Sequence, residues 1–393
     1  MPHLRVRFAT QQLEKQSKLW PVVGLLGPRQ SGKTTLIQTF LGVDSIVSLD
    51  SLQYRTEATQ SPSAFLSKLD FPVVVDEAQK APEIFDEIKL RVDQKRIPGR
   101  YFLTGSSSFS AKIGIRESLT GRIGLVRLYP MTLAELHQKP VRSLDFSNPV
   151  GLTPRFSIDE VIRSTQAGGM PVPAFFRDQE QRDSYWTSWL DTSLMRDLAR
   201  YYGRGYDPDF AYDLCIRIGK ILAEGELPTL RHFKKPAAKT RKYLSTMEEI
   251  FLLTRINCHS EGTGKEVWLL MDSGLASHLM QSSLGEGATQ SLIRHFLWNE
   301  WLSSSSFQGK RAERIYFKSA HGNPVDAILN GIPFKIVPSV HAATRQLKYE
   351  ERAVLGAMKK LGSKFGYILG PVDSITLPPK KGGIGVLPWG IWS

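Results

Sequence analysis

The strongest chemical signal in this sequence of 393 residues is a glycine-rich segment that ends in a lysine and two threonines. It consists of Gly27, Pro28, Arg29, Gln30, Ser31, Gly32, Lys33, Thr34 and Thr35. The spacing G-x-x-x-x-G-K-[ST] is that of a P-loop, in which glycines let backbone N–H groups approach a phosphate. The lysine then neutralises the β- and γ-phosphates, and the next hydroxyl binds Mg²⁺. The segment therefore predicts an ATP site, with Lys33 on the phosphates and Mg²⁺ held partly by Thr34.

Two consecutive acids form the second chemical signal. Asp76 and Glu77 follow the apolar residues 73–75, a pattern typical of a strand that is buried on both faces of a parallel sheet. Ligands of open α/β sheets bind at the carboxyl ends of such strands. Asp76 is predicted to support Mg²⁺, and Glu77 to orient and polarise the water that attacks the γ-phosphate. The alternative is an acidic strand end that is only solvated, and the preceding P-loop favours the catalytic interpretation.

These residues need a scaffold that brings them to one place. Strands are predicted at residues 22–26 and 45–50, within 71–78, and at 101–104 and 123–128. Helical patterns lie between most of these runs, and another helix is expected over residues 8–19. Because strands and helices alternate over residues 20–137, the sequence predicts an α/β fold with a doubly wound parallel sheet.

The order of several motifs resembles a known family. GPRQSGKT, VVVDEAQ, FLTGSSS, ESLTGR and LYPMTLAEL follow one another as in the AAA-type P-loop ATPases of bacteria and archaea that carry a C-terminal domain of unknown function. The downstream segments AGGMP, WLDT with a later Arg-Asp pair, and LLMDSGLA continue the resemblance over nearly the whole chain. The resemblance implies a Mg²⁺-dependent ATPase.

Two further site residues are implied by this resemblance. Thr104, at the end of a predicted strand, would be the γ-phosphate sensor of an AAA-type ATPase, with Ser106 as second choice; a plain Gly/Ser-rich loop is the alternative. Arg122, in the Gly-Arg pair, would contact a phosphate in cis or in trans. A solvated arginine at a strand start is the alternative for Arg122.

The middle of the chain reads as a helical region with an outline similar to a winged helix. Trp186, Leu190, Leu194 and Leu198 recur every four residues, which predicts packing. Residues 231–242 contain six basic side chains and no acid, namely Arg231, Lys234, Lys235, Lys239, Arg241 and Lys242. This run predicts nucleic-acid binding, with an ordinary solvated face as the alternative.

The last part of the chain suggests a restriction-endonuclease-like fold. The resembling family carries Glu-Val-Asp in one strand and Glu-x-Lys in the next. Here Asp326 keeps one acid, but Pro324 replaces the other, and Lys335 and Val337 occupy the places of the acid and the lysine. Glu300 is the candidate for a second ligand from a preceding helix. Because Mg²⁺ prefers clustered carboxylates, we expect this domain not to cut nucleic acid.

Composition sets the outer limits. The hydrophobic share of 41% and the charged share of 23% are ordinary for a globular protein, and the length predicts several domains. The expected divisions are an ATPase core at 1–140, a helical and winged-helix-like region at 141–285, and a nuclease-like domain at 286–393. The net charge of +13 hints at a polyanionic partner. The two cysteines suggest neither a metal site nor a disulfide framework.

The function that follows is ATP hydrolysis coupled to a conformational change on a nucleic-acid or protein partner, with assembly of several copies as a further candidate. The alternative is an ATP-responsive DNA-binding switch with little turnover. A nuclease effector is disfavoured by the missing carboxylate and lysine. Since neither a secretory signal nor a membrane-spanning run is evident, we expect a cytoplasmic protein without membrane contacts.

Overall fold

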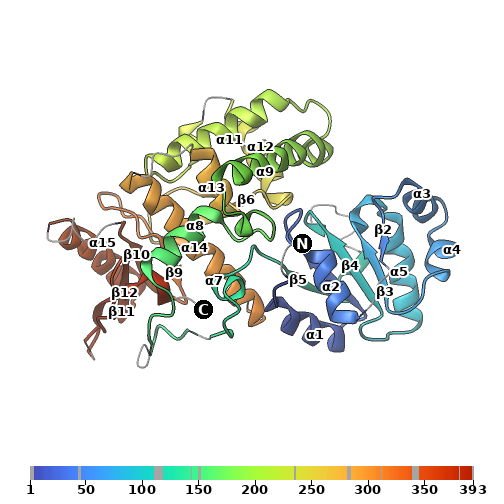
Figure 1. Ribbon diagram of the computed structural model, residues 1–393, viewed down its shortest axis with the longest axis horizontal. Coiled ribbons are helices and arrows are strands. Elements are labelled where there is room, and N and C mark those ends of the chain that lie inside the picture. Colours follow the sequence, from blue (N-terminus) through green and yellow to red (C-terminus); the bar gives the residue numbers. More distant parts are fainter. Residues whose placement is uncertain are drawn as a thin grey trace.

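The computed structural model describes residues 4–42, 46–109, 118–142, 144–148, 152–233, 236–280, 285–310, 312–338, 345–379 and 381–391, without the side chains of 345–348. One parallel sheet lies at one end of the molecule and a second sheet at the other, with helices between them (Figure 1). Among the helices in these ranges, none has both the length and the hydrophobicity that crossing a bilayer requires.

The N-terminal sheet is parallel throughout, with strand order β2-β3-β4-β1-β5. Its strands are β1 (Val22–Leu26), β2 (Val47–Ser48), β3 (Val73–Asp76), β4 (Tyr101–Gly105) and β5 (Ile123–Arg127). The helices of this part are α1 (Ala9–Leu19), α2 (Lys33–Leu41), α3 (Leu52–Gln60), α4 (Pro62–Ser67), the 3₁₀ turn η1 (Ala78–Lys80) and α5 (Glu83–Gln94). Five parallel strands confirm the predicted sheet.

Helices cover both faces of this sheet because alternate strand residues point in opposite directions. Val23 and Leu25 of β1 share a core with residues of α1 and α2. Val22 and Leu26 belong to another core, formed with residues of α3, α4 and α5. The sheet is therefore doubly wound, as the sequence predicted.

The middle of the chain is mainly helical and has its own apolar core. Its first elements are α7 (Leu133–Leu136), α8 (Ile158–Ala167), the turn η3 (Pro173–Phe175), α9 (Gln179–Thr192), the π-helical η4 (Ser193–Leu198) and α10 (Ala199–Tyr202). Then follow α11 (Pro208–Ala223), η5 (Leu230–His232), α12 (Ala237–Glu249), β6 (Leu253–Cys258), β7 (Val267–Leu270) and α13 (Ser273–Met280). Trp186, Leu190, Leu194 and Leu198 are buried in this core, so the predicted stripe is packing.

Helices α11 and α12 precede an antiparallel pair, β6 and β7, and a bridge joins Thr229 to Val267. The order of helix, short bridge, helix and hairpin has the outline of a winged helix. A later strand, β8 (Ile315–Tyr316), extends this sheet by pairing with β6 in parallel. The pairing crosses the expected division at residue 285, so the middle and last parts share one sheet.

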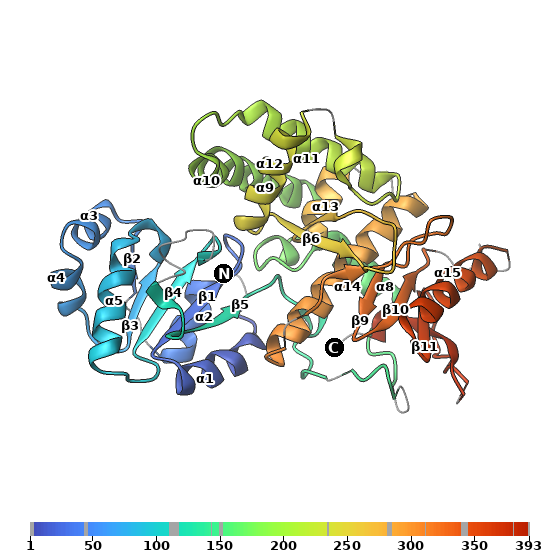
Figure 2. The ribbon, with the colours of Figure 1, turned by 180° about the vertical axis from the view of Figure 1, so that it is seen from behind.

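The last part contains the long helix α14 (Glu286–Phe307) and a four-stranded sheet of order β12-β11-β10-β9. Its other elements are β9 (Ala327–Leu329), β10 (Ile332–Ile336), α15 (Arg345–Leu361), β11 (Phe365–Gly370), β12 (Gly383–Pro388) and η6 (Trp389–Ile391). The pair β9–β10 is antiparallel, whereas β10–β11 and β11–β12 are parallel. Figure 2 shows α14 running from this sheet toward the N-terminal part.

Candidate functional site

The P-loop joins the carboxyl end of β1 to the first residue of α2. A Cβ at Gly27 would lie 2.3 Å from the carbonyl oxygen of Leu128, so only glycine fits there. Gly32 has φ of +90°, a left-handed conformation that glycine adopts without strain. The hydroxyl oxygen of Ser31 is buried and has no hydrogen-bond partner among the described residues. This narrow loop at a helix N-terminus is suited to hold phosphate.

Lys33 is folded into the loop. Its Nζ donates hydrogen bonds to the carbonyl oxygens of Gly27 (3.1 Å) and Pro28 (2.9 Å), and the residue is 5% exposed. Burial lowers the pKa of Lys33, while the nearby carboxylates of Glu77 and Asp76 act in the opposite direction. A bound triphosphate would give this ammonium group an anionic partner, which favours its charged form.

Asp76 contacts Thr34, the other residue that is predicted to bind Mg²⁺. Its Oδ1 accepts hydrogen bonds from the hydroxyls of Thr34 (3.0 Å) and Thr104, and its Oδ2 accepts one from Ser48 (3.4 Å). A single carboxylate beside a threonine fits Mg²⁺, because this ion takes its remaining ligands from phosphates and water. The described residues contain no group of three His, Cys, Asp or Glu side chains that would hold a metal alone.

Glu77 is held in a fixed orientation beside Asp76. Its φ of +56° is left-handed, and its N–H donates to Oγ1 of Thr104 (3.2 Å). Its Oε2 accepts hydrogen bonds from Ser106 (2.8 Å) and Gln79 (2.5 Å). Both proposed sensor residues therefore contact the acids, and Gln79 is a contact that the sequence interpretation missed.

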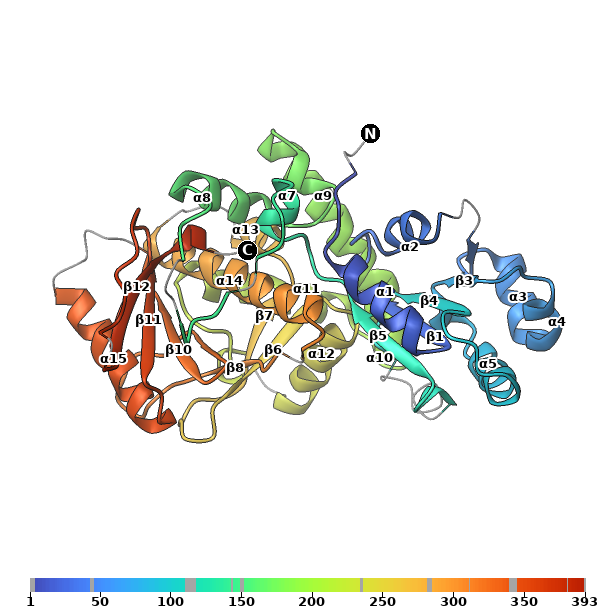
Figure 3. The same ribbon diagram turned by 90° about the horizontal axis from the view of Figure 1, so that it is seen from below.

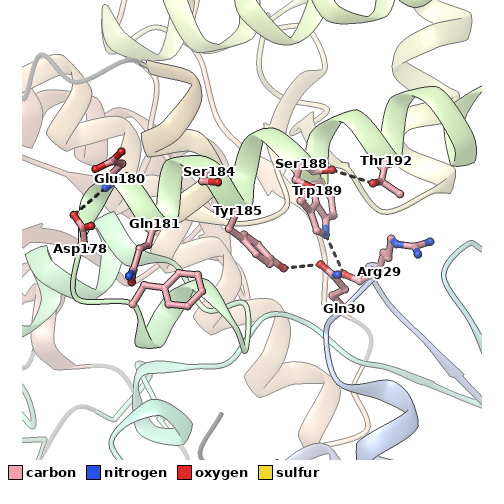
Figure 4. A pocket seen from close by; sticks show the side chains of 11 residues that line it. Arg29, Gln30, Asp178, Glu180, Gln181, Ser184, Tyr185, Ser188, Trp189 and Thr192 are labelled. Carbon is pink, nitrogen blue, oxygen red and sulfur yellow. Dashed lines mark hydrogen bonds between the residues drawn. The ribbon is translucent and has the colours of Figure 1, made fainter. Parts of the chain in front are cut away.

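A helix from the middle of the chain lies across the P-loop, and no motif predicted this. Tyr185 of α9 donates from its hydroxyl to Oε1 of Gln30 (2.8 Å), and Trp189 donates from Nε1 to the carbonyl oxygen of Arg29 (3.2 Å) (Figure 4). These side chains line a pocket of about 790 Å³ between α9 and the loop. Arg29 also lies 3.5 Å from the carboxylate of Asp197 in η4.

The comparisons with known proteins agree with this geometry. Residues 20–137 match the model of a family described as an AAA domain. The matched residues, called the AAA domain below, include the P-loop and both acids of the strand end.

The chain also matches individual proteins. Uncharacterized proteins of Mycobacterium bovis and Mycobacterium tuberculosis are each 31% identical over 196 residues, which is 49% of this chain and 40% of each relative. The alignment thus spans less than half of the relatives' length. A solved Walker-type ATPase of Pyrococcus abyssi matches with a TM-score of 0.37 and 15% identity, over 69% of this chain and 94% of that one.

Two arginines of the middle region lie near Lys80, which follows the acidic strand end of the AAA domain. Burial and the positive charges of Arg196 and Arg200 together lower the pKa of Lys80 to about 8. Lys80 pairs with Asp50. The π-helical η4 and the adjoining α10 carry these two arginines, and π-helical turns frequently occur at functional sites.

Arg122 does not lie at the nucleotide site of its own AAA domain, so the expected contact in cis is wrong. Arg122 precedes β5, and its carbonyl oxygen accepts a hydrogen bond from the N–H of Val22 (3.2 Å) at the amino end of the sheet. The P-loop follows the opposite end of β1, about 16 Å away for five residues of strand. The guanidinium instead pairs with Asp93 at 2.7 Å. A contact in trans stays a prediction.

The basic run at 231–242 makes contacts within the chain. Lys234 and Lys235 lie outside the described residues. Three of the other cations make contacts at the surface. Lys239 pairs with Asp207 (2.8 Å) and Arg241 with Glu266 (3.7 Å), and Lys242 lies over the ring of Tyr202 (3.8 Å). Surface pairs of this kind are weak, so a polyanion would be able to replace the acids. Nucleic-acid binding by this run stays a prediction.

The two acids considered for a nuclease-like site have different partners. Asp326 accepts hydrogen bonds from Nε of Arg294 and from the N–H of Ile336, both at 2.8 Å. Glu300 instead accepts the N–H of Leu133 at 2.6 Å. Glu300, the candidate for a second ligand, therefore contacts α7 and shares neither of these partners of Asp326.

The AAA domain is joined to α14 by a chain of buried polar contacts. Arg7 donates from Nη1 to the P-loop carbonyl of Ser31 (2.9 Å) and from Nε to Oε1 of Glu135 (3.1 Å). The other oxygen of Glu135 accepts the N–H of Thr132 (2.8 Å) in a capping box of α7. Since Leu133 in α7 donates to Glu300 in α14, a continuous path leads from the P-loop to the last part of the chain.

Proposed function

We propose that this protein is a Mg²⁺-dependent ATPase of the AAA type. The observation that carries the proposal is the convergence of Thr34 and Thr104 on the Asp76 carboxylate, beside an oriented Glu77. Lys33 and the loop N–H groups would hold the phosphates, and Thr34 and Asp76 would hold Mg²⁺. The metal ion would stabilise charge on the transferring phosphoryl group. Glu77 would orient and polarise the attacking water.

Hydrolysis would be coupled to movement of the region that covers the loop. Tyr185 and Trp189 contact two P-loop residues, Gln30 and Arg29. A triphosphate that reshapes the loop would change these contacts, and with them the position of α9 relative to the AAA domain. The partner on which this movement acts would be a nucleic acid or a protein.

The decisive experiment compares Lys33→Ala and Glu77→Gln with the unaltered protein. Lys33→Ala should weaken ATP binding by about 10- to 100-fold, as expected for the loss of a charged hydrogen-bond donor. Glu77→Gln should keep ATP affinity and lose turnover. Lys18→Ala, which removes an exposed lysine, is the matched control. Equal ATP affinity of Lys33→Ala and the control would refute the assignment.

The runner-up function is a DNA-binding switch that responds to ATP with little turnover. The arrangement of α11, α12, β6 and β7 supports it. Removing the charges of Lys234, Lys235, Lys239, Arg241 and Lys242 should then weaken duplex binding. The log–log salt slope should also fall by about one unit for every phosphate that these side chains no longer neutralise. A measurement of turnover with and without duplex DNA separates the two functions, since a coupled ATPase changes its rate and a switch does not.

A further inference from the structure

A second polar pocket, of about 570 Å³, lies where the winged-helix-like part meets the C-terminal sheet. Its walls come from η5, the loop between β6 and β7, α14, the segment before β9, and β10. Figure 3 shows β6, β8 and β10 in a row beside α14. None of the residues that line this pocket belongs to the AAA domain. Its volume falls within the range of about 300 to 1,000 Å³ that small-molecule sites occupy.

The floor of the pocket holds two buried cations, Arg294 and Lys335, each 2% exposed. Nε of Arg294 lies 2.8 Å from Oδ1 of Asp326. Nζ of Lys335 lies 3.4 Å from the other oxygen of Asp326 and 3.5 Å from Oε2 of Glu350. Two cations and two acids make this group neutral. The ammonium of Lys335 lies between the two carboxylates, in the place that a divalent cation would need.

Two polar atoms on this floor lack a hydrogen-bond partner among the described residues. One is the buried donor Nη1 of Arg294, and the other is Oε2 of Glu350, which lies 3.5 Å from the ammonium of Lys335. An unsatisfied charged donor is costly, because it has lost its water without gaining an acceptor. The donor belongs to a residue that lines an open pocket, so an acceptor brought by a ligand would satisfy it. Arginine in such a position suits the oxygens of a phosphate or carboxylate.

The rim of the pocket carries a positive charge. It is formed by Arg231 of η5, Lys265 of the β6–β7 loop and Lys318, with Glu226 as the acid among the lining residues of the rim. With the floor neutral, these residues leave an excess of two positive charges. A phosphate monoester carries about −1.5 to −2 at neutral pH, so rim and ligand would match in charge. A carboxylate ligand would carry only one negative charge.

We propose that this pocket binds a phosphate monoester of mononucleotide size. Nη1 of Arg294 contacts a phosphate oxygen from the floor, and Arg231 and Lys318 bind the phosphate from the rim. The pocket binds this group without cleaving it, because Lys335 fills the position of a catalytic cation. The phosphate belongs either to a free mononucleotide or to the 5′ end of a nucleic-acid strand. This binding is independent of the P-loop.

The experiment measures binding by calorimetry in two backgrounds, the full chain and its Lys33→Ala variant. The probes are inorganic phosphate, AMP, and a tetranucleotide with and without a 5′-phosphate. In each background the rim variant Arg231→Gln/Lys318→Gln is compared with Lys359→Gln/Lys360→Gln, which removes two charges from the exposed face of α15. Arg294→Lys is the floor variant, since it keeps a cation beside Asp326 and removes Nη1.

In both backgrounds the rim variant should bind the best phosphorylated probe at least about tenfold more weakly, or 1.4 kcal/mol. The α15 variant should bind it as before, and Arg294→Lys should fall between the two. Tighter binding of AMP identifies a free mononucleotide, and tighter binding of the phosphorylated tetranucleotide identifies a strand end. The proposal would be overturned if the rim and α15 variants lost the same affinity for the phosphorylated probe. It would also be overturned if the rim variant bound every probe as tightly as the unaltered protein. If Lys33→Ala leaves ATP binding unchanged while the rim variant still weakens binding of the phosphorylated probe, the P-loop assignment fails and the assignment of this pocket stands.

Discussion

At the scale of single residues, Asp76 is the centre of the candidate catalytic site. Two threonine hydroxyls, from α2 and from the end of β4, share one of its oxygens. If Mg²⁺ took the place of the Thr34 contact, Thr104 would still hold the carboxylate and accept the N–H of Glu77. We therefore propose that Thr104 is a positioning residue, which would act on the metal ligand and on the water-orienting acid together.

Replacing Thr104 by valine should lower turnover more than ATP affinity. Valine keeps the shape of threonine but neither holds Asp76 nor accepts the Glu77 N–H. Loss of a residue that orients a metal ligand costs about 10- to 100-fold in activity. Thr104→Ser, which retains the hydroxyl, should recover most of the rate. Steady-state kinetics of both variants over a range of Mg²⁺ concentrations is the measurement. A similar loss in both variants would contradict the role of the hydroxyl.

The predicted site residues that the structure brings together are those whose positions follow from local spacing. Lys33, Thr34, Asp76 and Glu77 sit at strand ends or in a turn, and a parallel sheet brings such ends to one edge. Arg122 shows the limit of this reasoning. The sequence placed it at the start of a strand, and the structure puts that start at the edge of the sheet away from the P-loop.

At the scale of elements, the decisive feature is the helix that lies over the P-loop. Tyr185 contacts Gln30 across 155 residues of sequence. Such a contact leaves no periodicity in the chain, because each partner also suits its local helix or loop. The apolar stripe of α9 predicted packing correctly, but it did not predict what the polar tips of Tyr185 and Trp189 touch.

ATP binding should change the fluorescence of Trp189. This indole is 4% exposed and donates to the carbonyl oxygen of Arg29 at 3.2 Å, so a change in loop shape alters its surroundings. We expect the nucleotide-dependent signal of the full chain to be largely lost in Trp189→Phe. Trp268→Phe, which alters another buried tryptophan, should retain it. A signal that survives in Trp189→Phe would mean that α9 does not sense the loop.

A second element-scale link joins α14 to β7 through a buried histidine. Nε2 of His295 accepts the N–H of Leu270 (3.1 Å), so the ring proton sits on Nδ1, which faces the carbonyl oxygen of Ser291 (2.7 Å). Burial lowers the pKa of His295 from 6.5 to about 4. Since the unfolded chain binds this proton more readily, stability is complete above pH 6.5 and falls as the pH drops toward 4.

The expected loss at this histidine is about 3 kcal/mol over that pH interval, at about 1.4 kcal/mol per pKa unit. Urea unfolding between pH 4 and 7 is the measurement. In His295→Gln, whose amide provides one donor and one acceptor, the pH dependence should be smaller. His321→Gln, at an exposed histidine, should follow the unaltered protein. If both variants show equal slopes, His295 does not control acid stability.

At the scale of the whole molecule, the buried polar path from Ser31 through Arg7 and Glu135 ends at Glu300 of α14. Glu300 is 1% exposed and accepts the N–H of Leu133 at 2.6 Å. Next to it, Nδ2 of Asn299 donates to the carbonyl oxygen of Pro130 (3.3 Å). Buried networks of this kind favour one arrangement of the parts they join. We therefore expect a change at the P-loop to alter the surroundings of α14.

Removing the Glu300 carboxylate should uncouple the AAA domain from α14. Glu300→Ala leaves a buried N–H without its acceptor, which should lower stability by about 1 to 3 kcal/mol. Glu300→Gln retains a neutral acceptor and should lose less. In the unaltered protein, we expect ATP to slow hydrogen exchange in α14 as well as in the P-loop. In Glu300→Ala the P-loop effect should persist and the α14 effect should disappear. Glu286→Ala, at an exposed acid of the same helix, is the control. An undiminished α14 response in Glu300→Ala would show that the coupling takes another route, such as the contacts of α9.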